Sequence, residues 1–275
     1  MQRRSTLDRL LFGYAVVAAM LSLSAVGHGQ ALAARHLPWD IESSSSQPTD
    51  NAKNRPRVPL TRRKTFDKLL LPPLKKGMVW TYKGHVQVTD AVNKDITWRQ
   101  EITEVVTYKN VTAAVLKGHP RDLWFYEEGR KPGRYLWVCV NNKKLYELEG
   151  DRVDSVLKLI RAKSDITKEL TGDDLIVDLP LNLQNCFGSQ NLTQAPLFCW
   201  KVDQVSFADL KKVKLPSLLA TELRRAYSYS MIYRANTDHT VVHFVRGLGF
   251  VDYAGSHHGT LCDFELHLQE LSYPR

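Results

Sequence analysis

Apolar and polar residues alternate along most of the chain from residue 78 onward, and this pattern constrains the fold more than any other feature. Between Met78 and Val88, apolar side chains recur at every second position, with Lys83, His85 and Gln87 between them. The closing segment repeats the pattern, with Cys262, Phe264, Leu266 and Leu268 alternating with Asp263, Glu265, His267 and Gln269. Because successive strand side chains point to opposite faces, this alternation indicates half-buried β-strands.

Segments of this kind follow one another with short turns between them. In chain order they are Ile96–Tyr108, Val111–Lys117, Leu123–Glu127, Tyr135–Val140, Lys144–Leu148, Cys199–Val205, Tyr227–Ala235, Thr240–Arg246, Phe250–Ala254 and Thr260–Leu271. Asn141-Asn142 predicts a tight turn, because asparagine tolerates positive φ, and Gly247 and Gly249 predict another turn or a bulge. Since short turns join antiparallel neighbours, we predict a mainly β fold, a curved antiparallel sheet or half-barrel.

Two segments break the alternation and predict helices. Between Arg152 and Leu170, apolar residues recur at helical spacing, and Asp151 is a candidate N-cap. A second, short helix is expected to start at Pro216, because proline suits the first turn of a helix. We expect one or two helices packed on the concave side of the sheet.

Residues 1–33 have the three-part pattern of a secretory signal peptide. A basic start containing Arg3, Arg4 and Arg9 precedes an apolar run, and Ala31-Leu32-Ala33 matches a cleavage motif. The alternative is a retained membrane anchor, but the apolar run is short for a span of about 20 residues. We predict cleavage after Ala33, or one residue later, and an exported chain in the periplasm or outside the cell. The absence of a nearby cysteine argues against a lipid anchor.

The net charge of +9 is concentrated in one place. Between Lys53 and Lys76 there are nine basic residues and one acidic residue, whereas the chain from Gly77 onward is nearly neutral. We predict a disordered basic linker over residues 34–68 and a single antiparallel β domain over residues 69–275. This distribution argues against nucleic-acid binding. The linker could contact an anionic membrane or cell-wall surface, or it could simply be solvated.

The β domain contains one internal sequence similarity. The segment Pro73–Trp80 resembles Pro180–Phe187, and each precedes a predicted strand. The domain could therefore consist of two related halves, or the similarity could be chance.

Four cysteines in an exported chain favour disulfide formation. Cys186 and Cys199 flank a polar loop, and we predict a disulfide between them. Cys139 and Cys262 each lie in a predicted strand and could pair with each other or remain buried thiols.

The chain contains none of the common catalytic sequence motifs, and we expect no cofactor. A histidine-rich region supplies weak candidates for a metal site, namely Asp238, His239, His257 and His258, with His243 nearby. On a strand, His239 and His243 would lie about 13 Å apart, too far to share one ion. The more ordinary interpretation is that these side chains cap strand ends and bind turn backbone.

The aromatic residues of the first strands suggest a different kind of site. Trp80, Tyr82 and Trp98 could line the concave face of a curved sheet and hold a lipid or another hydrophobic molecule. The leading hypothesis is therefore an exported, non-catalytic binding or envelope-associated protein with a hydrophobic ligand. One alternative is a metal-dependent hydrolase using the region from His239 to His258. Another is a structural surface or interaction protein, which a filled sheet interior would favour.

Two motifs resemble a group of uncharacterised secreted bacterial β proteins. The segment Pro73–Tyr82 is similar to their opening, which reads PLKxGxxWTY. Phe244–Gly249 and His257–Thr260 are similar to their closing strands, with Arg246 in place of the usual proline. The resemblance implies an exported β fold and no known activity. At the level of fold, a long antiparallel sheet around a helix also resembles lipoprotein carriers of the LolA/LolB type.

Overall fold

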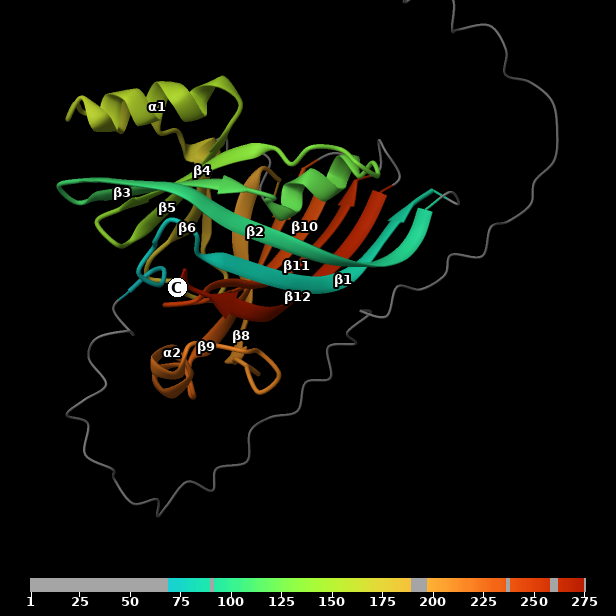
Figure 1. The fold of residues 1–275 in the computed structure, drawn as a ribbon. Coiled ribbons are helices and arrows are strands. Elements are labelled where there is room, and N and C mark those ends of the chain that lie inside the picture. The colour runs from blue at the N-terminus through green and yellow to red at the C-terminus, as the bar shows by residue number, and fades with distance from the viewer. Residues whose placement is uncertain (1–68, 90–91, 189–196, 236–237, 258–261, 275) are drawn as a thin grey trace, which may run out of the picture. The chain divides into compact units, whose positions relative to one another are not determined.

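A computed structural model describes residues 69–89, 92–188, 197–235, 238–257 and 262–274, which form one antiparallel sheet of twelve strands (Figure 1). The strands are β1 (Val79–Val88), β2 (Val92–Tyr108), β3 (Val111–Lys117), β4 (Arg134–Val140), β5 (Lys144–Glu149), β6 (Leu175–Asp178), β7 (Cys186–Gly188), β8 (Cys199–Phe207), β9 (Tyr227–Arg234), β10 (Asp238–Val245), β11 (Gly249–His257) and β12 (Cys262–Ser272). The predicted signal peptide and basic linker lie outside the described residues.

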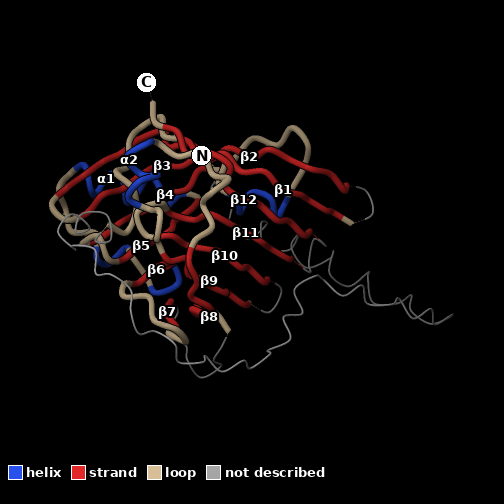
Figure 2. The backbone as a smooth tube through the Cα atoms, turned by 90° about the horizontal axis from the view of Figure 1, so that it is seen from below, coloured by secondary structure: helices blue, strands red, loops and turns tan. Residues whose placement is uncertain are grey.

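The sheet consists of two meanders joined by their first and last strands. Strands β1 to β6 pair in chain order, β7 to β12 do the same, and β1 pairs with β12. Figure 2 shows β2, β1, β12, β11, β10, β9 and β8 following one another side by side. The two similar segments begin at Pro73 and Pro180. Each begins six residues before the first strand of a meander, since β1 starts at residue 79 and β7 at residue 186. Whether the two halves are related stays a prediction.

The sheet curls until distant strands meet across its interior. Trp137 of β4 contacts Trp80 of β1 edge-on, with ring centroids 5.7 Å apart, and Phe250 of β11 at 5.8 Å. Strands β4 and β11 are five positions apart in the strand order, so only strong curvature can bring them together. The free edges also approach each other, because a Cβ on Gly188 of β7 would lie 3.8 Å from the Leu175 carbonyl oxygen of β6. The predicted curved antiparallel β fold is confirmed, as a nearly closed barrel.

Helix α1 (Asp151–Arg161) lies on the convex face of the sheet, not on the concave side where it was expected. Its apolar residues Val153, Val156, Leu157 and Ile160 pack with Ala113, Val115, Leu136, Val138 and Leu148. On β3 and β4 these positions alternate with Ala114, Leu116 and Trp137, which face the interior. Because these strands are apolar on both faces, the outer face also needs a cover, and α1 supplies it.

Three 3₁₀ turns accompany the helices. The predicted helix ends at Arg161, and its remainder forms only η2 (Thr167–Glu169), followed by η3 (Gly172–Asp174). The predicted strand Leu123–Glu127 is wrong, because this segment belongs to η1 (Pro120–Phe125). The His119 side chain caps η1 and Pro120 opens it, a combination that favours a turn over a strand. Leu123 of η1 is fully buried in the interior cluster.

Helix α2 (Ser217–Glu222) is present as predicted, but it starts one residue after Pro216, which is its N-cap. Leu219 of α2 and Leu223, its C-cap residue, belong to the same cluster that contains Trp80 and Trp137. The expected packing of a helix toward the interior therefore holds for α2.

The two turn predictions that rest on backbone geometry agree with the structure. Asn141 and Asn142 have φ values of 55° and 53° between β4 and β5. Gly247 and Gly249 have φ values of 77° and 99° between β10 and β11. Glycine adopts such values without steric cost, and asparagine does so more readily than most residues.

The predicted disulfide between Cys186 and Cys199 is confirmed and links β7 to β8. Cys139 and Cys262, whose pairing was left open, are buried free thiols. Burial raises the pKa of the Cys139 thiol to about 11, so it is protonated and unreactive at neutral pH. Within the described segments, no helix has the length and apolar character needed to cross a membrane.

Candidate functional site

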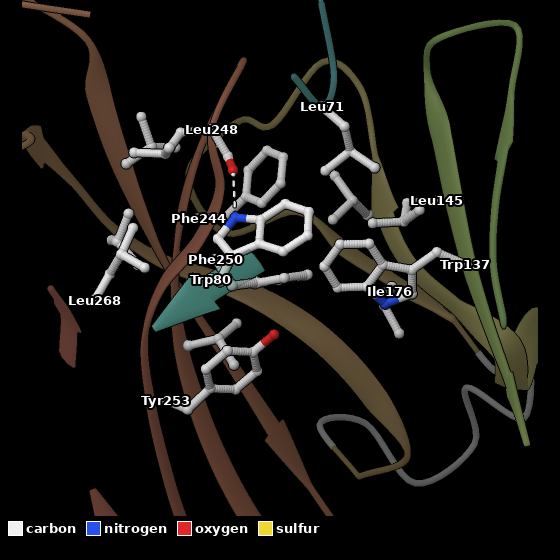
Figure 3. Packing of buried hydrophobic residues seen from close by; sticks show 14 of the residues in the cluster. Leu71, Trp80, Trp137, Leu145, Ile176, Phe244, Leu248, Phe250, Tyr253 and Leu268 are labelled. Carbon is white, nitrogen blue, oxygen red and sulfur yellow. Dashed lines mark hydrogen bonds between the residues drawn. The ribbon is translucent and has the colours of Figure 1, made fainter. Parts of the chain in front are cut away.

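Two of the three aromatic residues predicted to bind a ligand lie inside the filled core. Trp80 and Tyr82 are fully buried. The Trp80 indole donates to the Leu248 carbonyl at 3.2 Å, as the dashed line in Figure 3 shows, and the Tyr82 hydroxyl donates to the Phe250 carbonyl at 3.0 Å. Figure 3 also shows Phe244, Phe250 and Trp137 crowded around the Trp80 ring. A ligand could reach Trp80 or Tyr82 only if this core opened.

Trp98, the third predicted ligand residue, packs against the outer edge of the same core and is only half-buried. Its indole donates to the Gly118 carbonyl at 2.8 Å, and its half-buried ring lines a small cavity of about 130 Å³. Asp122, Tyr126 and Arg130 line the same cavity. Trp98 is directly opposite Tyr82 in the β1–β2 register and packs against the same core, but it also borders this polar opening.

The metal candidates are brought together only in part. Asp238 and His257 face each other across β10 and β11, with Oδ1 and Nε2 3.2 Å apart. His239 is opposite Ser256 in the register, so it lies on the other face from this pair. His258 lies outside the described residues. Among the residues that are described, no three His, Cys, Asp or Glu side chains gather as metal ligands would.

A cluster of polar and charged side chains surrounds the buried Glu147 carboxylate where η1 meets the sheet. Glu147 of β5 has 5% side-chain exposure, and its Oε2 lies 2.9 Å from Nε2 of His119, which has 3%. Trp137, which faces Glu147 across the β4–β5 register, donates to the same oxygen at 2.9 Å. Arg121 donates to Oε1 at 3.4 Å. Both oxygens of the carboxylate therefore have partners.

The hydrogen bonds also define the state of the imidazole. Nδ1 of His119 accepts the backbone N–H of Arg121 at 3.2 Å, so this nitrogen carries no proton. The ring proton is then on Nε2, which lies 2.9 Å from Oε2 of Glu147. Burial alone would raise the pKa of Glu147, but His119, Arg121 and Trp137 outweigh it and lower the pKa to about 2. Glu147 is ionised at neutral pH.

This cluster has little capacity for acid–base catalysis. A carboxylate with a pKa near 2 is a weak base, and both ring nitrogens of His119 are occupied. On its outer side, Tyr135 packs its ring 4.8 Å from the His119 ring and donates its hydroxyl to Asp122 at 2.9 Å. Burial raises the pKa of Tyr135, which keeps the phenol protonated as a donor. The arrangement anchors η1 to the sheet.

The interpretation of the sequence missed this cluster, although one signal was present. In Lys144–Leu148, Glu147 has the same parity as Leu145, so the alternation assigns it to the buried face. A charged residue at a buried position predicts a partner of opposite charge or a set of hydrogen bonds. The partners themselves could not be named, because η1 was mistaken for a strand.

A second polar site lies on the outer face of the sheet. An open groove of about 540 Å³ crosses β12, β1 and β2, and the paired residues Gly84 and Ile96 of neighbouring strands are among those that line it. Its polar lining residues are Lys83, His85, Asp95, Thr97, Glu265, His267 and Gln269. Lys83 and His85 alternate with the buried Tyr82 and Val86, which places the groove on the convex side.

A row of hydrogen-bonded histidines and carboxylates leads into this groove. His243 Nδ1 lies 2.7 Å from one oxygen of Asp252, and His267 Nδ1 lies 2.8 Å from the other. His267 Nε2 is 2.9 Å from Glu265. Burial alone would raise the pKa of Asp252, but the two histidines lower it. The hydrogen bond to Asp252 is the main cause of the raised pKa of His267. His267 is thereby held in a fixed orientation at the groove.

Comparisons with known proteins define no family for this chain. No protein-family description and no curated protein matches it. Among solved structures, it is similar to a candidate exported protein with a YmcC-like fold from Bacteroides fragilis, with 9% identity and a TM-score of 0.35 over 74% of this chain and 100% of the other. It is also similar to a candidate lipoprotein from Parabacteroides distasonis, with 11% identity and a TM-score of 0.30 over 74% and 98%. Both overlaps are too loose to carry a function over.

Proposed function

We propose that this chain is exported and acts as a non-catalytic binding protein of the cell envelope. In this proposal the barrel is a scaffold, and a polar envelope component binds to the outer groove over β12, β1 and β2. Export rests on the signal pattern of residues 1–33. The observation that carries the proposal is the contrast between an interior packed with aromatic rings and an open polar groove of about 540 Å³ outside it.

The groove chemistry favours a ligand that both donates and accepts hydrogen bonds. Lys83 and Gln269 offer donors, whereas Asp95 and Glu265 offer acceptors. The one apolar residue of the lining besides Gly84 is Ile96, whose side chain packs against the interior cluster, so little hydrophobic surface is available to a lipid tail. Peptidoglycan is a suitable probe, because its glycan hydroxyls and charged peptide groups offer both kinds of partner.

The proposal is tested by co-sedimentation of the purified chain with peptidoglycan sacculi. The wild-type chain is expected to pellet with the sacculi. The double substitution Lys83→Ala and His267→Ala should weaken the apparent affinity by about tenfold, since a hydrogen bond to a charged group contributes about 1.5 kcal/mol. Lys168→Ala is the matched control, because Lys168 is an exposed lysine on η2, away from the groove lining. Its binding should equal that of the wild type.

The remaining hypotheses give different results in separate measurements. A lipid found by native mass spectrometry of the purified chain would mean that the core opens and would favour a hydrophobic ligand. Stoichiometric zinc, iron or copper together with hydrolase activity would favour the metal-dependent hydrolase. If the double variant binds the sacculi as strongly as the wild type does, the groove is not the binding site.

A further inference from the structure

Strand β8 ends in an edge that its neighbour does not cover. Strand β7 pairs only with Cys199–Lys201, and the loop before β7 adds two backbone bonds at Val202. A register shift follows between Val202 and Gln204. In the part of the chain that the structure describes, residues 204–207 pair on one side only, with β9. Such an edge presents backbone groups to which another strand can add.

The hydrogen-bond pattern shows which residues present those groups. The Ala208 N–H donates to the Ala226 carbonyl, so residues of this parity on β8 point their backbone groups toward β9. Val205 and Phe207 have the opposite parity. Their N–H and C=O groups therefore point outward at the open edge.

Exposed apolar side chains gather around the same edge. The described part of the chain has six strongly exposed large apolar residues, and four of them lie here: Leu183 (55% exposed), Val205 (37%), Phe207 (67%) and Tyr227 (51%). Phe207 and Tyr227 are directly opposite each other and stack, with ring centroids 4.9 Å apart. Natural sheet edges are usually protected by charges or proline, and Gln204–Phe207 has neither.

We propose that a second copy of this chain pairs with this edge, antiparallel to it and centred on Ser206. Val205 then lies opposite Phe207 of the partner subunit, and Phe207 lies opposite Val205 of the partner subunit. Val205 and Phe207 both point their backbone groups outward at this edge. Each of the two Val205–Phe207 pairs therefore exchanges two backbone hydrogen bonds, which gives four in all. Gln204–Phe207 is self-complementary, because an aromatic residue meets a β-branched residue on one face and these four residues carry no charge. This inference does not depend on the proposed groove.

The register has a direct test in disulfide trapping. The centre of the pairing places Ser206 opposite Ser206 of the partner subunit as a non-hydrogen-bonded pair, with about 4.5 Å between Cα atoms. That separation lies within the range for a disulfide. Ser206→Cys is therefore expected to form a covalent dimer on mild oxidation. Gln204→Cys is the control, because the two Gln204 positions would lie about 13 Å apart. It should remain monomeric on a non-reducing gel.

Sedimentation velocity over a concentration series provides the second test. The wild-type chain should shift from monomer to dimer as its concentration rises. Phe207→Asp should weaken the association at least about tenfold, since it buries a charge at the junction. Phe125→Asp, at an exposed phenylalanine on η1, should dimerise as the wild type does. A wild-type chain that stays monomeric, a dimer insensitive to Phe207→Asp, or equal trapping of both cysteine variants would overturn the proposal.

Discussion

Glu147 shows how a single charged residue can belong to an apolar sheet. A buried carboxylate is tolerated only when its charge is balanced and its oxygens accept hydrogen bonds. Here Trp137 and His119 share one oxygen, and Arg121 takes the other. Since His119 is the N-cap of η1 and Arg121 lies in its first turn, the same contacts attach η1 to the β4–β5 hairpin. The charge of Glu147 thus helps to hold η1 in place on the sheet.

Replacing Glu147 with glutamine should destabilise the fold by about 3 kcal/mol at pH 7. The amide can offer only one oxygen to His119 and Trp137, and it turns an NH₂ group toward Arg121. The free energy of unfolding can be measured by urea titration, with tryptophan fluorescence as the signal. Glu149→Gln is the control, because the Glu149 side chain is 58% exposed and 3.7 Å from Arg121. It should change stability by less than about 0.5 kcal/mol.

The effect of Glu147 should depend on pH in a defined direction. Its pKa is about 2 when folded, below the ordinary value of 4.5, so its contribution is fully present above pH 4.5. The contribution is lost as the pH falls toward 2, and about half should be gone at pH 3. The stability difference between wild type and Glu147→Gln should therefore shrink from pH 7 to pH 3. A difference that stays constant over this range would contradict the ion-pair explanation.

At the scale of elements, the period-two pattern predicted the long strands well and the short ones not at all. Strand β3 has the predicted ends, Val111 and Lys117. Strands β6 and β7 were missed, because Leu175–Asp178 and Cys186–Gly188 are too short to show a period. The false strand Leu123–Glu127 has the opposite cause. Leu123 and Trp124 are buried by a 3₁₀ turn, and a run of five residues cannot distinguish such a turn from a strand.

Gly84 allows β1 and β12 to approach each other closely, so we expect Gly84→Ala to be strongly destabilising. A Cβ at this position would lie 1.7 Å from the backbone oxygen of Glu265 and 2.7 Å from its carbonyl carbon. The two strands would have to separate at the rung that joins Gly84 to Leu266. Thermal unfolding should show a loss of about 3 kcal/mol or more, or no folded protein. Thr97→Ala, on the exposed lining of the groove, should stay within about 0.5 kcal/mol of the wild type.

The disulfide between Cys186 and Cys199 should stabilise the edge of the second meander. It closes a loop with a sequence separation of 13, for which chain entropy predicts about 3 kcal/mol. Reduction should lower the free energy of unfolding by that amount, and the double substitution Cys186→Ser and Cys199→Ser should be insensitive to reductant. Thiol titration in denaturant should find two reactive thiols before reduction, those of Cys139 and Cys262. Four thiols before reduction would contradict the bond.

At the scale of the whole molecule, closure depends on a contact that alternation cannot reveal. Strand β1 pairs with β12, which lies at the far end of the chain, and this pairing joins the two meanders. Every half-buried strand has the same pattern, so the pattern does not identify partners. The groove exists only because Lys83 and His267 become neighbours across β1 and β12, where the register pairs them directly.

The basic segment before the barrel should give the molecule a salt-sensitive attraction to anionic surfaces without contributing to its fold. Residues 53–68 contain seven basic residues and one acidic residue, whereas the chain from Gly77 onward is nearly neutral. The apolar anchoring of the barrel starts later, because Leu70 is fully buried and its N–H donates to Asn142 at 2.8 Å.

A chain that starts at residue 69 should therefore melt at the same temperature as one that starts at residue 34. Only the longer chain should pellet with vesicles that contain anionic lipid, and its binding should weaken from 50 to 300 mM salt, because screening shortens the reach of charges. Neutral vesicles are the control for both chains. Equal pelleting of the two chains would assign the attraction to the barrel, and a lower melting temperature of the shorter chain would show that residues 34–68 pack on it.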